Sequence, residues 1–211
     1  MPAFAETGDV LLTAALFIGT AVFAATGVLA SARRNMDWIG AVVLAVVVAT
    51  GGGTLRDLLI GRLPVFWVRE PVYIWIAAGT ALVMLPLLRV IRFPERALLL
   101  ADAAGLALFT WIGCVKAQEL GLHPTVVVLM GVLTGSGGGL IRDVLSAQVP
   151  TILRQSELYA AATIPGALLF VLLQQFAVAP AAVGAVCIAT VLLVRLAAIR
   201  WKLMLPETRG L

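Results

Sequence analysis

Two arginine–aspartate pairs, each preceded by three glycines and set in a long apolar run, are the residues of this sequence with the most unusual chemistry. The first stretch reads Thr50-Gly51-Gly52-Gly53-Thr54-Leu55-Arg56-Asp57, and the second reads Ser136-Gly137-Gly138-Gly139-Leu140-Ile141-Arg142-Asp143. Glycine weakens a helix by about 1 kcal/mol relative to alanine, and a charge at the centre of a bilayer costs about 2.5–3.5 kcal/mol. A chain that accepts both costs twice, in the same order, is predicted to use these residues.

The chemistry expected of the glycines is that of an oxygen-lined path. A triplet in the middle of a spanning segment predicts a half-helix, a kink or short unwound stretch, and a second half-helix. Broken backbone at membrane depth is tolerated only where it is buried in protein or lines a wet cavity. Freed carbonyl oxygens suit a monovalent cation, and hydroxyl groups stand close by at Thr50, Thr54, Thr134 and Ser136. The pattern therefore predicts a permeation or substrate site, and the alternative is close helix packing on small residues.

The charged pairs are expected to bond across the two stretches. Adjacent helix residues point about 100° apart, so an arginine does not face the aspartate beside it. We therefore expect Arg56 to pair with Asp143 and Arg142 to pair with Asp57. Two roles remain open for these charges: they clamp the two helices together, or they contact the permeant species directly. Asp102 and Lys116 lie near opposite ends of one apolar segment, where we expect both to reach the interface.

The composition is that of an integral membrane protein. Of 211 residues, 62% are hydrophobic and 12% are charged, and the mean hydropathy is +1.07. A soluble domain is nearer half apolar and a quarter charged. We therefore expect one membrane domain over residues 1–211, with no separate soluble domain.

Other function classes find little support in the residue types. One histidine and two isolated cysteines make no convincing metal site. No Ser-His-Asp, Cys-His or paired-carboxylate arrangement stands out, so we expect no enzyme and no resident cofactor. The net charge of +4 comes from basic residues in short loops, and no aromatic stripe accompanies them. We therefore expect no nucleic-acid partner.

The two glycine stretches belong to a duplicated unit. Arg56 and Arg142 are 86 positions apart, and the same ungapped offset aligns Gly19–Tyr73 with Gly105–Tyr159. The units are 10–91 and 96–176, and each holds three apolar segments of spanning length, about 20 residues. These segments, with a seventh that has no repeat partner, are 10–32, 37–62, 71–91, 97–118, 123–148, 157–176 and 180–199. Three spans is an odd number, so the second unit enters from the opposite side and the repeat is inverted.

The basic residues predict the orientation of these seven spans. One face holds three of them, and the other holds ten, which are Arg33, Arg34, Arg89, Arg92, Arg96, Arg154, Arg195, Arg200, Lys202 and Arg209. The positive-inside rule then puts the N-terminus outside and the C-terminus in the cytoplasm. We expect the first segment to remain in the mature chain, because Glu6 and Asp9 precede it without a basic residue.

Two inverted three-helix repeats plus a seventh helix, with the doubled Gly-Gly-Gly-x-x-Arg-Asp, resemble the prokaryotic branch of the TRIC (trimeric intracellular cation) channels. The resemblance covers about residues 10–200. It implies a homotrimer among membrane lipids, with a pore in each protomer between the second and fifth helices that passes potassium and other monovalent cations. The glycines matched to the family's hinges are Gly51, Gly52, Gly53, Gly137, Gly138 and Gly139.

One feature of animal members is missing here. They carry a Lys-Glu-Val motif linked to phosphoinositide binding, and this tripeptide does not occur in the sequence. We therefore expect a prokaryotic inner membrane location and no lipid regulator.

Two further functions remain open. The bacterial domain has also been labelled glycine-transporter-like, and broken helices in an inverted repeat are equally typical of a secondary transporter for a small zwitterion such as glycine. A structural membrane scaffold is the third possibility. The gating stimulus, the selectivity among cations and the helices at the trimer contact are not predicted.

Overall fold

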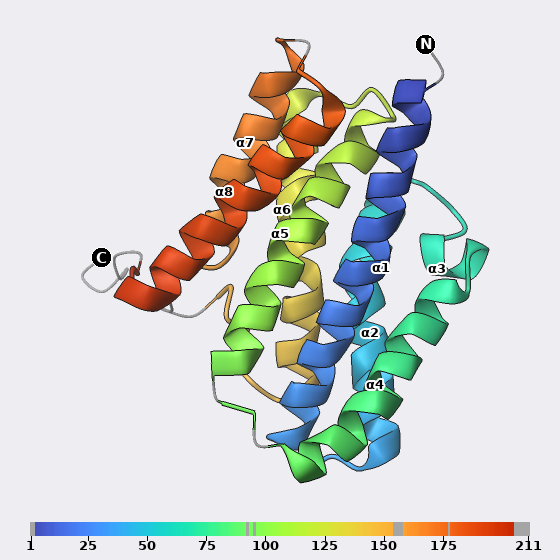
Figure 1. Ribbon diagram of the computed structural model, residues 1–211, viewed down its shortest axis with the longest axis vertical. Helices are drawn as coiled ribbons and strands as arrows, with labels where there is room; N and C mark the ends of the chain where they lie inside the picture. The colour runs from blue at the N-terminus through green and yellow to red at the C-terminus, as the bar shows by residue number, and fades with distance from the viewer. Residues whose placement is uncertain (1–2, 92, 95, 154–157, 177, 205–211) are drawn as a thin grey trace.

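The regular elements of this protein are helices (Figure 1), in a computed structural model that describes residues 3–91, 93–94, 96–153, 158–176 and 178–204. They are α1 (Ala3–Ala32), α2 (Trp38–Leu59), α3 (Phe66–Arg69), α4 (Val72–Val90), α5 (Arg96–Gln118), α6 (Pro124–Leu145), a 3-10 turn (Ala160–Ala162), α7 (Thr163–Gln174) and α8 (Pro180–Trp201). Three basic residues of the orientation argument, Arg92, Arg154 and Arg209, lie outside the described residues.

The expected membrane spans are present as helices. Within the described residues, six helices are long and apolar enough to cross a membrane, and the segment Ala160–Gln174 is a shorter apolar helix. The expectation of an all-helical membrane protein is confirmed. The sixth segment is shorter than the predicted 157–176 because α7 begins only at Thr163, after the 3-10 turn.

Local sequence explains where several helices begin. The Asp37 carboxylate accepts a hydrogen bond from the Gly40 amide at 2.7 Å and caps α2, which satisfies one of the free donors of the first turn. Proline occupies the first turn of α6 and of α8, where its missing N–H costs nothing.

The helices form two similar three-helix groups. The helices α1, α2 and α4 pack together, as do α5, α6 and α7, and the groups meet where α2 contacts α6 and α1 contacts α5. Figure 1 shows α1 starting at the upper end of the molecule and α5 starting at the lower end. The first helices of the two groups therefore run in opposite directions, as an inverted repeat requires. The helix α8 packs against α5 and α7.

The contact between α1 and α5 is built from repeat-related residues. The rings of Phe23 and Phe109 stack with centroids 5.0 Å apart and an angle of 5° between their planes. Each ring covers a glycine of the other group, because a Cβ at Gly105 would lie 2.5 Å from Phe23 and one at Gly19 would lie 2.9 Å from Phe109. Two glycines and two phenylalanines thus form a close packing contact between the two groups.

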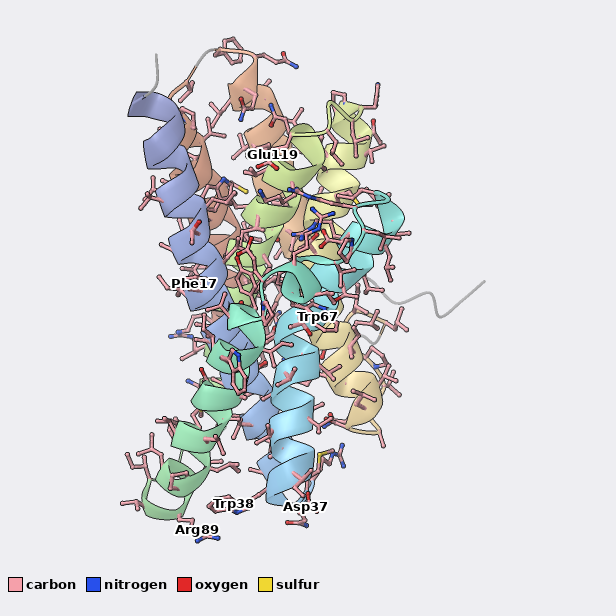
Figure 2. All side chains as sticks on the ribbon, turned by 90° about the vertical axis from the view of Figure 1, so that its right-hand side faces the viewer. Phe17, Asp37, Trp38, Trp67, Arg89 and Glu119 are labelled. Atoms are coloured by element: carbon pink, nitrogen blue, oxygen red, sulfur yellow. The ribbon has the colours of Figure 1, made fainter. Side chains whose placement is uncertain are left out.

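Aromatic and basic side chains mark one end of the bundle. Figure 2 shows Asp37, Trp38 and Arg89 at its lower end and Glu119 near its upper end. The Arg89 guanidinium lies 5.0 Å from the centroid of the Trp38 ring. Tryptophan and arginine at helix ends are typical of a membrane interface.

Candidate functional site

The glycine triplets lie inside continuous helices. Helix α2 runs unbroken through 51–53, and α6 runs unbroken through 137–139. The short unwound stretch expected as one possible outcome is therefore not formed, and no backbone carbonyl is freed there. An intact helix keeps every backbone group bonded, which a bilayer demands. A kink at either triplet stays a prediction.

The two triplets face each other across the α2–α6 contact. A Cβ at Gly138 would lie 2.7 Å from the carbonyl oxygen of Val48, and one at Gly137 would lie 3.0 Å from the Cα of Gly52. A Cβ at Gly52 would meet the Thr134 carbonyl oxygen closer than real Cβ atoms come. The glycines thus let two backbones touch, which is the packing role of small residues in membranes.

The remaining glycines of the triplets make room for side chains. A Cβ at Gly51 or at Gly53 would lie 2.5 Å from Ile141 or Phe66, respectively. A Cβ at Gly139 would collide with the hydroxyl group of Tyr159. A methyl group at any of these three positions would require a neighbouring side chain to move, and the terminal methyl group of Ile141 can do so most easily.

The four expected hydroxyl groups line these helices without using up their oxygen lone pairs. Each donates its hydrogen to the carbonyl four residues earlier: Thr50 to Val46 (2.8 Å), Thr54 to Thr50 (2.8 Å), Thr134 to Met130 (2.6 Å) and Ser136 to Val132 (2.7 Å). A hydroxyl that donates in this way can still accept a hydrogen bond or meet a cation. Only Thr54 has a described donor, the indole Nε1 of Trp67 at 2.9 Å.

The first arginine–aspartate pair bonds within itself. Arg56 reaches the Asp57 Oδ1 atom with Nε at 2.9 Å and Nη2 at 2.8 Å. The other oxygen, Oδ2, accepts from the backbone N–H of Phe66 at 2.8 Å. The aspartate therefore joins the end of α2 to the chain that returns after it.

The second pair repeats the arrangement on α6. Arg142 donates to the Asp143 Oδ1 atom from Nε at 3.0 Å and from Nη2 at 2.9 Å. The Oδ2 atom accepts from the N–H and the hydroxyl of Thr151, both at 2.8 Å. The expected cross-pairing between the two stretches is therefore wrong. The returning loop fixes each aspartate, and the long arginine side chain folds back to reach it.

Asp102 is a member of the site that sequence reasoning misplaced at the interface. It is 2% exposed, and its Oδ1 atom accepts from Arg142 Nη1 at 2.5 Å and from the Tyr159 hydroxyl at 3.3 Å. The repeat could have indicated a special role for Asp102, because an apolar residue, Leu16, occupies the equivalent position of the first unit. Lys116 does lie near the bundle end, where it pairs with the exposed Glu119 at 2.8 Å.

Two cavities flank the glycine contact, one beside each arginine. The cavity at Arg56 measures about 220 Å³ and the cavity at Arg142 about 330 Å³. They have no residue in common, but their walls contain the repeat-equivalent pairs Leu12 and Leu98, Arg56 and Arg142, and Asp57 and Asp143. Because α2 and α6 run in opposite directions, the cavities lie towards opposite ends of the bundle. The triplet contact separates them.

Comparisons with known proteins agree with this architecture. The family described as Glycine transporter matches residues 13–89 and 99–175. The UPF0126 inner membrane protein YadS of Escherichia coli is 44% identical over 191 residues, which is 90% of this chain and 92% of that protein. A UPF0126 membrane protein of Vibrio cholerae is 44% identical over 189 residues, 89% of this chain and 79% of that protein.

Solved structures of TRIC channels are also similar. The TRIC orthologue from Rhodobacter sphaeroides is 37% identical, with a TM-score of 0.87 over 92% of this chain and 99% of that chain. A second TRIC cation channel is 30% identical, with a TM-score of 0.84 over 93% of this chain and 97% of that one.

Proposed function

Because the chain belongs to the prokaryotic TRIC channel family, we propose that it is a cation channel of the inner membrane. The observation that carries the proposal is the pair of repeat-related cavities on either side of the α2–α6 glycine contact. A path from one cavity to the other needs only the separation of two helices. The proposed pore therefore runs between α2 and α6, within one protomer.

The proposed pore is closed in this conformation. A contact too tight for a methyl group at Gly52 leaves no room for an ion. Opening then means a relative movement of α2 and α6, and the population of the open state depends on the free energy of that movement.

Ion coordination in the proposed pore comes from neutral oxygens. The hydroxyl groups of Thr50 and Ser136 keep their lone pairs, whereas the Thr134 hydroxyl faces Gly113 of α5 instead. The carbonyl oxygens of Val48 and Thr134 lie at the contact itself, and each has a second lone pair besides its helical hydrogen bond. Such oxygens can replace part of the hydration shell of a monovalent cation. We propose potassium as the main permeant ion, with sodium as a second.

Assembly and orientation complete the proposal. The Rhodobacter sphaeroides relative is an orthologue of the trimeric intracellular cation channels, and we propose a homotrimer in which each protomer carries its own pore. Arg33, Arg34, Arg89 and Arg96 lie at the end where α2 begins, and the positive-inside rule makes that end cytoplasmic. The N-terminus is then outside.

Flux through proteoliposomes tests the proposal against a transporter. A channel accelerates potassium efflux without saturation and shows no saturable uptake of labelled glycine. Saturable glycine uptake with no potassium leak would establish the transporter instead. Helices α2 and α6 are each unbroken, so they lack the half-helix N-termini that would favour a transporter. Protein that folds correctly and supports neither flux would contradict both.

A further inference from the structure

The two repeat-related arginines differ in the hydrogen bonding of one atom, Nη1. Arg142 uses Nε and Nη2 on Asp143 and Nη1 on Asp102. Arg56 uses the same two atoms on Asp57, but its Nη1 has no hydrogen-bond partner among the described residues. This difference arises in the first helix of each unit. The second unit has Asp102 there, and the first unit has Leu16 at the equivalent position.

The unpaired Nη1 belongs to a buried cation. Arg56 is 2% exposed, and its guanidinium lies 5.7 Å from the centroid of the Phe66 ring. A charged donor that loses water without gaining an acceptor is costly. An oxygen supplied from outside the chain would remove that cost.

The cavity beside Arg56 favours an anion. Its wall holds four basic side chains, Arg56, Arg62, Arg69 and Lys116, and two acidic ones, Asp57 and Glu70. Arg62 and Lys116 share the single carboxylate of Glu119. The excess of positive charge raises the local concentration of anions. A volume of about 220 Å³ holds a small molecule and excludes a folded partner.

We propose that this cavity binds a small monocarboxylate, whose oxygen accepts from Arg56 Nη1 as Asp102 accepts from Arg142. A carboxylate matches the planar guanidinium better than a spherical ion does. Arg56 lines the cavity and its Nη1 atom is buried, so binding includes a local movement of the wall. The same cavity is one end of the proposed cation pore, and a bound carboxylate would offset part of the positive charge that a cation meets there. The binding test itself does not depend on conduction.

Thermal unfolding of the purified protein in detergent tests the site, with sodium acetate as the probe. Ionic strength is kept constant with sodium chloride. A ligand that binds only the folded state raises the unfolding midpoint by about 3–5 °C for each tenfold increase above its Kd. We expect this rise in the wild type and in Leu16→Met, which keeps the apolar volume. Leu16→Asp supplies its own carboxylate to Arg56 and is expected to lose the response.

The second repeat supplies the reciprocal test. Asp102→Leu leaves the Nη1 of Arg142 unpaired, so the variant is expected to unfold at a lower temperature and to gain an acetate response. Leu16→Asn, whose amide oxygen can also accept, replaces Leu16→Asp if that variant does not fold. Four results would overturn the proposal: no acetate response in the wild type, an undiminished one in the variant with an acceptor at Leu16, no gain in Asp102→Leu, or an equal response to phosphate or additional chloride.

Discussion

Replacing Gly52 by alanine puts a methyl group at the point where α2 and α6 touch. The new Cβ meets the Thr134 carbonyl oxygen, which is part of the α6 backbone and cannot rotate away. The two helices must therefore shift to admit it. Gly79 is the matched control, since it lies inside α4 and a Cβ there meets nothing within 4 Å.

The two substitutions have opposite expected signs. Alanine gains about 1 kcal/mol over glycine in a helix, and overpacking a tight site costs about 1–3 kcal/mol. Gly52→Ala is thus expected to lower the free energy of unfolding by about 0–2 kcal/mol. Gly79→Ala is expected to raise it by about 1 kcal/mol, so the variants differ by about 1–3 kcal/mol.

Unfolding in mild detergent and single-channel recording together check this prediction. Because the methyl group holds the two helices apart, Gly52→Ala is also expected to change open probability or unit conductance, whereas Gly79→Ala leaves both at the wild-type level. Gly138→Ala, whose Cβ would lie 2.7 Å from the Val48 carbonyl oxygen, is expected to perturb the same step. Equal stability of Gly52→Ala and Gly79→Ala, with wild-type currents from both, would refute the tight contact and its place in the pore.

Two further predictions concern the buried contacts of Asp102 and of Tyr159, which lie beside the second arginine. Asp102→Ala removes the buried partner of Arg142 and is expected to cost about 3–5 kcal/mol of unfolding free energy. The control is Arg62→Ala, which breaks the exposed ion pair with Glu119 and is expected to cost less than about 1 kcal/mol; similar losses would contradict the buried pairing. Gly139→Ala collides with the Tyr159 hydroxyl, so Tyr159→Phe is expected to relieve it, with a coupling of at least about 0.5 kcal/mol in a double-mutant cycle; additive effects would contradict the contact.

The helices and their pairing were largely predictable from the sequence. Apolar runs of spanning length located the membrane helices, because the bilayer imposes both length and composition. The 86-residue offset aligned Gly19 and Phe23 with Gly105 and Phe109, but it did not predict that the two phenylalanine rings stack at the α1–α5 contact.

The partners of the charged residues were not predictable in the same way. Whether Arg56 turns towards Asp57 depends on the loop that brings the Phe66 N–H back to that carboxylate, and no local pattern predicts the path of a loop. The prediction of an unwound stretch was wrong for another reason. A glycine costs a helix about 1 kcal/mol, whereas each backbone group left unpaired in lipid costs several kcal/mol, so the helix continues through the triplet.

The central claim, that this protein conducts cations, is tested most directly by the reversal potential in a planar bilayer with a tenfold gradient of potassium chloride. A channel selective for potassium over chloride shows unitary current steps that reverse near the potassium equilibrium potential, about 59 mV in magnitude. A reversal near the chloride potential, of opposite sign, or silent bilayers from correctly folded trimer would contradict it.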